Sequence, residues 1–472
     1  MALLSTPTYA LQPSAEQVAL STNYITDFDF LNQYLPDLME REVARYGNRT
    51  VGGWLNRVGA ELPSNSDMIK WAEQGRLHTK YVNCSTSASA NADSATITVS
   101  DSNVTAIAFR AGQTVNISNN SNGLSNKGII TSVNTTYNTF TVAYYEAAGQ
   151  TYASGGTLTV WVYGSEFRKG TEGMIGSLES EDSFYENNPI ILKDKYAVNG
   201  SDMAQIGWVN VTTENGATGY LWYLKSEAET RLRFDDYLET AMIEAVPAET
   251  GSGVATASLN PTYGNNGSEG IFYVVNNRGN VWGAGNPTTI SDFDTILQRL
   301  DKQGNIEENA LFVDRNFSLD IDDMLAAQNS YGAGGTSYGM FNNDKNMALN
   351  LGFSGFRRGS YDFYKSDWKY LNDPQFRGGL YAGGAGTVTG LLVPAGTKSV
   401  YDQVLSMNVT RPFLHVRYRA SATEDRRYKS WITGSAGGAR TSDLDAMEVN
   451  FLSERCVCTL GANNFMLFRY GS

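Results

Sequence analysis

The chain has 472 residues, with 36 Lys and Arg against 49 Asp and Glu, and its formal net charge is −13. An acidic chain without a basic block repels phosphate, which argues against sequence-specific binding of nucleic acid. The hydrophobic fraction of 41% is ordinary for a folded chain with a sizeable core, and no apolar run approaches the ~18 residues of a membrane-spanning helix. The first segment, MALLSTPTYALQPSAEQ, lacks the basic region of a secretory signal. Three cysteines make no disulfide framework, so a reducing cytosol is the expected compartment.

The first part of the chain is predicted to be extended. Within residues 1–65, LPDLMEREVARYG predicts one short helix, because Pro36 stands near its first turn and Gly47 can end it. Residues 66–81 are partly polar and favour an extended segment. These features predict an arm rather than a compact domain.

The composition changes sharply between Val82 and Gly164. Ser and Thr alternate with apolar residues there, so that SATITVS places Ala95, Ile97 and Val99 on one face. About six such short strands, separated by Asn and Gly turns, predict a small β-barrel or sandwich inserted into the chain. Only five residues of this stretch are charged: Asp93, Asp101, Arg110, Lys127 and Glu146.

A long helix is predicted from Gly219 to Val246, where strong helix formers run without an internal Gly or Pro until Pro247 ends the pattern. Its i,i+4 pairs of Glu and Arg contribute only ~0.2–0.5 kcal/mol each, so burial of an apolar stripe must supply most of its stability. That stripe is the candidate structural site of the protein: Leu221, Leu224, Ala228, Leu232, Leu238 and Met242.

Helices and strands alternate in the region from 270 to 400. ISDFDTILQRLDKQG predicts a helix with Ser291 as its N-cap and Gly304 after its end. ALFVD predicts a buried strand, and SLDIDDMLAAQNS predicts a second helix capped by Ser318. This alternation favours an α/β subdomain. Beyond it, FLHVRYRA predicts a strand and AMEVNFLSERCVCTL a strand pair.

Motifs of catalysis and metal binding are weak. GTSYG matches the nucleophile elbow of a serine hydrolase, with Ser337 as nucleophile and His415 downstream, but its flanks predict a loop instead of a strand and a helix. DRNFSLDIDDML resembles a calcium loop, yet Leu319 and Leu325 occupy positions that need Gly and Glu, so a helix cap is favoured.

The cysteines and basic clusters suggest no further chemistry. Cys456 and Cys458 would share one face of a strand, but the chain holds too few Cys and His for a zinc site, and no metal or cofactor is predicted. FRRGS and EDRRYKSW are predicted to form surface salt bridges, with contact to a polyanion or a neighbouring subunit as the alternative.

The order of these elements resembles the major capsid protein of tailed bacteriophages, the Hong Kong 97-type fold. Three stretches, IILKDKYAVNGSDMAQIGWV, GYLWYLKSEAETRLRFDDYLE and LFVDRNFSLDIDDMLAAQN, are similar to the major capsid proteins of crAss-like phages, and the resemblance runs from about residue 166 to 470. It implies an α+β fold with a small all-β barrel insertion. The implied parts are an N-terminal arm (1–65), an extended loop or E-loop (66–212) with the barrel (82–164), a P-domain with a spine helix (213–269), an A-domain (270–400) and the C-terminal strands of the P-domain (401–472).

The resemblance also implies a function. A major capsid protein assembles into hexamers and pentamers, and these form an icosahedral head around double-stranded DNA without reading its sequence. Auxiliary or head-fibre proteins and the portal are the other expected partners. The expected location is the virion, assembled in the cytoplasm of the bacterial host, with no membrane association and no enzymatic activity. Some shells of this fold join a Lys to an Asn covalently, but those positions have no match here.

Two other classes of function stay open at this level. A β-rich phage or surface adhesin would suit the barrel, although the long helix and the helical α/β region argue against it; the Ser337 hydrolase is the least favoured. The barrel itself has two candidate roles, a clamp on neighbouring subunits, which we favour, and a docking site for an auxiliary protein.

Overall fold

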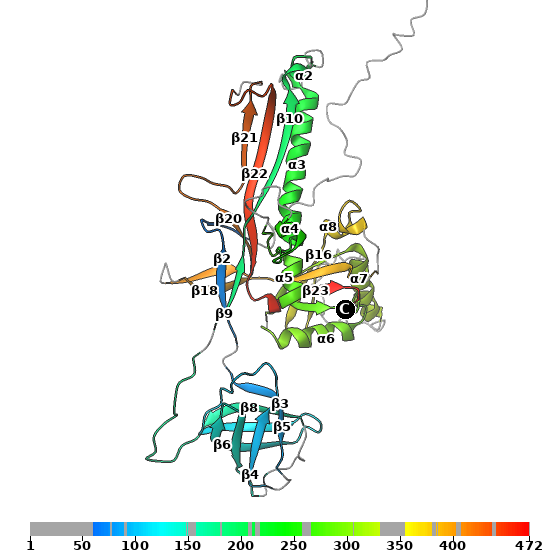
Figure 1. The fold of residues 1–472 in the computed structure, drawn as a ribbon. Helices are drawn as coiled ribbons and strands as arrows, with labels where there is room; N and C mark the ends of the chain where they lie inside the picture. The colour runs from blue at the N-terminus through cyan, green and yellow to red at the C-terminus, as the bar shows by residue number, and fades with distance from the viewer. Residues whose placement is uncertain are drawn as a thin grey trace, which may run out of the picture.

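The computed structural model describes residues 60–75, 78–88, 92–147, 149, 157–179, 182–205, 210–212, 218–256, 266–304, 306–330, 355–379, 384, 386–402, 407–436 and 440–471. These residues form an elongated body of sheet and helix, an α/β lobe beside it, and a barrel that a narrow stem holds away from both (Figure 1). The predicted arm up to residue 59, with its short helix, lies outside the described residues. The mixed helical and strand content predicted from the sequence is confirmed.

The elongated body is built on one sheet. Its strand order is β1-β20-β22-β10, with β21 also paired to β22, and only the β1–β20 pair is parallel. The predicted strand pair AMEVNFLSERCVCTL is instead one strand of 14 residues, because its first part pairs with β10 and β21 and its last part with β20. The strands are β1 (Ala60–Ser64), β10 (Ile190–Asn199), β20 (Leu414–Arg419), β21 (Lys429–Gly434) and β22 (Ala446–Thr459).

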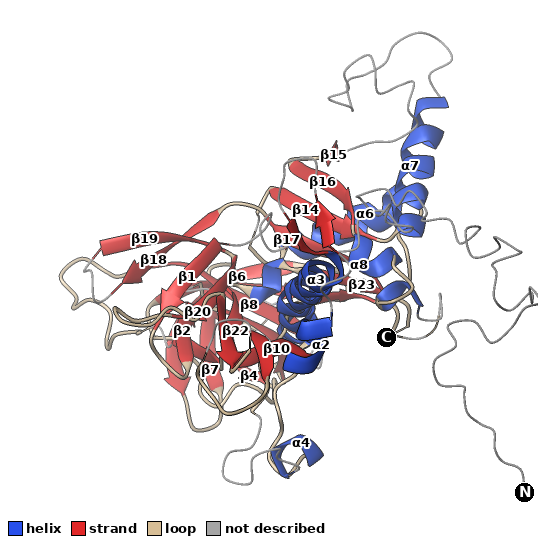
Figure 2. Ribbon diagram, turned by 90° about the horizontal axis from the view of Figure 1, so that it is seen from above, coloured by secondary structure: helices blue, strands red, loops and turns tan. Residues whose placement is uncertain are grey.

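The predicted long helix is α3 (Leu221–Glu244), which lies along β10 and β22 and stands between the sheet and the lobe (Figures 1 and 2). It ends three residues before Pro247, as the absent amide hydrogen of proline requires. The chain reaches it through α2 (Gly200–Gln205) and a short hairpin of β11 (Asn210–Thr212) and β12 (Thr218–Tyr220).

The lobe is a second sheet, of order β13-β23-β17-β14-β16-β15, with helices packed on it. The predicted strand ALFVD is β14, and the fully buried β17 beside it shows that this sheet is covered on both faces. The strands are β13 (Asn280–Trp282), β14 (Glu308–Val313), β15 (Gly355–Arg358), β16 (Tyr361–Asp367), β17 (Val388–Pro394) and β23 (Met466–Arg469). Because β23 joins the lobe, residues 401–472 contribute to both bodies.

The helices of the lobe begin elsewhere than the sequence predicted. Those described are α5 (Ile271–Arg278), α6 (Ile290–Asp301), α7 (Arg315–Ser330) and the short α8 (Lys369–Asn372). Ser291 is not the N-cap of α6, since Thr289 forms a capping box with Asp292. Asp294, three residues after Ser291, is instead hydrogen-bonded to Arg358 of β15. Ser318 is not the cap of α7 either: it lies buried inside the helix, and Asp314 accepts the Phe317 amide hydrogen at 2.7 Å.

The barrel insertion is confirmed. Its six strands close in the order β3-β4-β7-β6-β5-β8 around their own apolar core, which the sequence indicated by strict alternation. The stem that carries it is the antiparallel pair of β2 (Ile69–Gln74) and β9 (Asp182–Asn187). The barrel strands are β3 (Lys80–Thr86), β4 (Ser94–Val99), β5 (Gln113–Asn119), β6 (Ser125–Asn134), β7 (Thr139–Tyr144) and β8 (Leu158–Ser165).

Shorter elements complete the described part of the chain. They are α4 (Gly253–Thr256), the hairpin of β18 (Thr397–Asp402) and β19 (Met407–Pro412), and the 3-10 turns η5 (Arg377–Gly379) and η6 (Ala462–Asn464). None of the helices in the described ranges combines the length and apolarity needed to cross a membrane.

Candidate functional site

The predicted apolar stripe of α3 contains both buried and exposed residues. Leu238 and Met242 are buried in the subunit, whereas Leu232 is 39% exposed and Ala228 is exposed too. Leu221 and Leu224 lie on the first turns of α3, but their side chains are outside the described part. The six residues therefore do not form one buried face within a single subunit.

The prediction named only part of the side of α3 that the subunit buries: it included Leu238 and Met242 but missed Thr230 and Phe234. Phe234 is fully buried, and its ring centroid lies 5.5 Å from that of Tyr428 and 5.8 Å from that of Phe451. Thr230, Phe234, Leu238 and Met242 follow one another at intervals of four, which is the signal that could have found this face. Ile243 and Glu239 are buried beside them.

The C-terminal end of α3 is fastened to the lobe. Glu244, the last residue of the helix, forms an ion pair with Arg377 and accepts a hydrogen bond from the Tyr370 hydroxyl at 2.6 Å. Burial, together with this bond, raises the pKa of Tyr370, so the phenol stays protonated. The Arg377 guanidinium also lies 5.0 Å from the ring centroid of Phe272 on α5. Aromatic packing and a partly buried ion pair thus fix α3 to both bodies.

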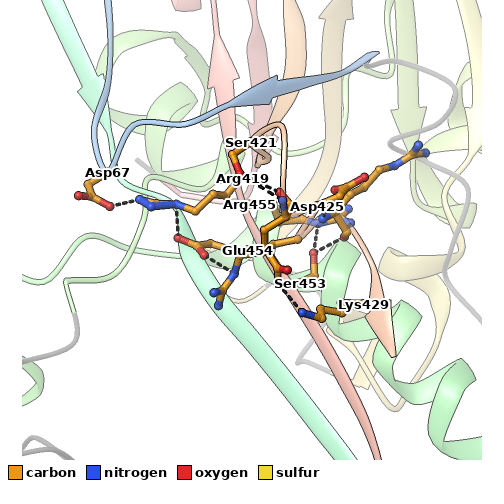
Figure 3. Close-up of polar contacts among 11 residues, drawn as sticks. Asp67, Arg419, Ser421, Asp425, Lys429, Ser453, Glu454 and Arg455 are labelled. Atoms are coloured by element: carbon orange, nitrogen blue, oxygen red, sulfur yellow. Dashed lines mark hydrogen bonds and ion pairs between the residues drawn. The ribbon is translucent and has the colours of Figure 1, made fainter. Parts of the chain in front are cut away.

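A charged junction links β1 to β22 within the long sheet (Figure 3). Arg455 of β22 is buried; its Nη1 lies 3.3 Å from Glu61 Oε1, and Glu61 also pairs with Arg427. Arg455 further donates to Ser453 Oγ at 2.9 Å and to the Arg427 carbonyl at 2.8 Å. Burial lowers the pKa of Arg455, and the Glu61 carboxylate opposes that shift. Each of the three guanidinium nitrogens thus has a hydrogen-bond partner, and the buried charge is paired with a carboxylate.

The second half of the junction is centred on the buried Glu454. Its carboxylate lies 3.0 Å from Arg419 Nε and 2.8 Å from Arg426 Nε, and Arg419 also pairs with Asp67 (Figure 3). Residues 60–67, β20 and the β21–β22 pair are therefore tied together at one point. The sequence missed this network because its partners are remote in the chain; Glu61 and Arg455 are 394 residues apart.

The two basic clusters form salt bridges, as predicted. In FRRGS, Arg358 makes two hydrogen bonds of 2.8 and 2.9 Å to Asp294, and Arg357 lies 3.5 Å from Asp362. In EDRRYKSW, both arginines take part in the charged junction.

The stem is anchored by one buried asparagine at the end of β9. Asn187 donates to the carbonyls of Val457 at 2.6 Å and Glu269 at 3.0 Å. Its Oδ1 accepts from Ser268 Oγ at 2.9 Å and from the Glu269 amide at 2.8 Å. The Asn188 amide also donates to Oδ1, at 2.8 Å. A side chain with five hydrogen bonds fixes the direction in which the stem leaves the sheet, and no sequence pattern distinguished it from the other asparagines.

Of the candidates for catalysis and metal binding, the described part brings together only His415 and the two cysteines of β22. Ser337 and the whole GTSYG motif lie outside it. His415 is buried on β20, with Nδ1 3.3 Å from the Pro412 carbonyl, and it faces Cys458 across the sheet. Across the described ranges no three His, Cys, Asp or Glu side chains are grouped so that they could hold a metal ion.

Comparisons with known proteins give structural similarity only. No protein-family model and no curated protein matches the chain. A structure of Microbacterium phage Oxtober96 is similar over 92% of this chain and 96% of its own, with 9% identity and a TM-score of 0.38. The capsid structure of cyanophage P-SCSP1u matches over 66% of this chain and 81% of its own, with 11% identity and a TM-score of 0.32. The encapsulin of Synechococcus elongatus matches over 62% and 77%, with 12% identity and a TM-score of 0.33.

Proposed function

We propose that this chain is the major capsid protein of a tailed bacteriophage, with a Hong Kong 97-type fold and a structural role without catalysis. The observation that carries the proposal is the open form of the subunit. A long helix lies along a long sheet, an α/β lobe stands beside it, and a barrel is held away on a two-stranded stem (Figure 1). Parts this extended need neighbouring molecules to cover them.

The exposed apolar side chains support this need for neighbours. Ile175 is 80% exposed and Phe184 75% exposed on the segments that connect the barrel to the sheet, and Phe167 and Leu178 are exposed on the same segments. Ile191, at the start of β10 in the sheet, is exposed as well. Large apolar groups gathered on one extended part mark an interaction surface. Obligate interfaces bury about 2,000–5,000 Å², and shell contacts of that size would cover these side chains.

In this proposal each part has a mechanical role. Residues 1–65 are the N-terminal arm, 66–212 the E-loop with its barrel at 82–164, 213–269 the P-domain with its spine helix, 270–400 the A-domain and 401–472 the returning P-domain strands. The helix α3 acts as a stiff beam, and its exposed positions Ala228 and Leu232 face a neighbouring subunit. The charged junction and Asn187 set the angle between beam, arm and stem.

The finer parts of the proposal rest on the sequence. The three stretches quoted above favour a crAss-like phage. Subunits form hexamers and pentamers of an icosahedral head around double-stranded DNA, with auxiliary or head-fibre proteins and the portal as further partners. The mature protein is part of the virion, and it assembles in the cytoplasm of the bacterial host. The barrel acts as a clamp on neighbouring subunits.

Microscopy of the full-length chain tests the proposal. Expressed in bacteria alone and with the scaffolding factors of the phage, the chain should form closed shells, curved sheets or hexamers in negative stain. Ser337→Ala serves as the control for a hidden catalytic role and should leave the particle yield unchanged. A chain that stays monomeric at high concentration with the scaffolding factors present would refute the assignment.

A further inference from the structure

A pocket of about 580 Å³ lies at the surface of the barrel. It is lined by residues of β6, β5 and β8 and by the two residues that follow β7, and these four strands are neighbours in the barrel. Its volume is within the range of small-ligand sites, about 300–1,000 Å³. The residues that matter for its chemistry are Thr114, Lys127, Tyr145, Tyr163, Gly164 and Glu166.

The walls of the pocket combine aromatic faces with charged groups. Tyr145 and Tyr163 are both exposed, although each has an apolar ring. The Tyr145 hydroxyl donates to Glu166 Oε2 at 2.5 Å, which holds ring and carboxylate together. Lys127 Nζ lies 5.9 Å from the ring centroid of Tyr163. Glu146 adds a second carboxylate, so the lining carries two negative charges against one positive charge.

The floor of the pocket is kept open by a glycine. A Cβ on Gly164 would come within 3.3 Å of Thr114 Oγ1. Thr114 is only 4% exposed, and its hydroxyl has no hydrogen-bond partner in the described part of the chain. The register of β5 and β8 shifts at this point, and such bulges often re-aim side chains next to binding sites. A polar floor atom and a missing side chain together make room for a hydroxylated ligand.

We propose that this pocket binds a neutral hexose unit of a polysaccharide. The exposed tyrosine rings offer flat apolar faces to the C–H side of a sugar ring, and the carboxylates can accept hydrogen bonds from its hydroxyls. The excess of negative charge disfavours acidic sugars and phosphates. A bound peptide strand is disfavoured as well, because each of the four strands is already paired on both sides in the closed barrel.

Saturation-transfer NMR on the full-length chain tests the proposal, and it does not depend on particle assembly. The probes are the methyl glycosides of glucose, galactose, mannose and N-acetylglucosamine. At least one should receive saturation at its ring protons, with a millimolar Kd, as a shallow pocket predicts. Tyr163→Ala and Gly164→Val should weaken binding about tenfold or more, a loss of about 1.4 kcal/mol. Tyr137→Ala is the matched control, because Tyr137 is 74% exposed on the same barrel but does not line the pocket.

Three results would overturn the proposal. The first is the absence of saturation transfer to all four glycosides. The second is unchanged binding in Gly164→Val, whose barrel should stay folded as judged by circular dichroism. The third is a combination of two results: the parent chain gives no glycoside signal, and Tyr163→Ala impairs particle formation. That combination would identify the pocket as a contact between subunits.

Discussion

Two alanine substitutions on one turn of α3 separate the stability of the subunit from its assembly. Phe234 is fully buried against Tyr428 and Phe451, so Phe234→Ala should lower the free energy of unfolding by about 3–5 kcal/mol. Leu232 is 39% exposed. Full burial of a leucine contributes about 1.5–3 kcal/mol, so Leu232→Ala should cost the free subunit about 1–2 kcal/mol.

For the free energy of assembly, the order of the two positions should be reversed, so that Leu232 contributes more than Phe234. If a neighbouring subunit covers the exposed two-fifths of Leu232, that contact contributes about 0.6–1.2 kcal/mol per subunit, worked from the same coefficient. Leu232→Ala should then raise the protein concentration at which particles form by about threefold to sevenfold. Phe234→Leu, which keeps an apolar side chain at the buried site, should assemble at nearly the parent concentration.

The assays are urea unfolding of free subunits, followed by tryptophan fluorescence, and light scattering of assembly against protein concentration. Equal destabilisation of the free subunit by Phe234→Ala and Leu232→Ala would show that the burial pattern of α3 is wrong. An unchanged assembly threshold in Leu232→Ala would show that this face of the helix does not meet a neighbour.

Four further outcomes follow from the same structure. Glu61→Gln leaves the buried Arg455 guanidinium without its carboxylate and should lower the free energy of unfolding in urea by about 3 kcal/mol. Glu424→Gln, which breaks the exposed pair with Lys429, should change it by no more than about 0.5 kcal/mol. Equal effects of the two substitutions would contradict the role of the junction. The hydrogen bond from Arg358 lowers the pKa of Asp294. This carboxylate therefore stabilises the fold above the ordinary aspartate pKa of about 4 and loses that effect as the pH falls through its lowered pKa. Asp294→Asn should flatten the acid limb of a plot of stability against pH, and an identical limb would refute the coupling. Leu232→Pro should abolish heads, since proline inside a helix costs about 3 kcal/mol or more and bends its axis; normal heads in the microscope would show that the rod is dispensable. Replacing residues 85–163 by a Gly/Ser linker should lower the temperature at which DNA-filled heads burst, whereas normal heads that lack a surface protein would favour the docking role of the barrel.

The sequence by itself determined the elements whose information is local. The barrel follows from alternation over short strands with almost no charge, and its closure needs only partners within the same stretch. The long helix follows from strong helix formers without Gly or Pro, and β14 from a short apolar run. In each case a residue and its neighbours in the chain carry the whole pattern, so the element can be predicted before any tertiary contact is known.

The tertiary structure alone decided which surfaces and partners those elements use. Both Thr289 and Ser291 stand three residues before an aspartate, but Arg358 from a distant strand binds Asp294 and leaves only Thr289 with an acid for its capping box. Phe234 instead of Leu232 became the core contact of α3 because the aromatic side chains of β22 and the segment before β21 meet that side of the helix. The charged junction and the passage of β23 into the lobe depend on residues hundreds of positions apart. Pairing of this kind is selected by the free energy of the whole assembled core and leaves no periodicity in the local sequence.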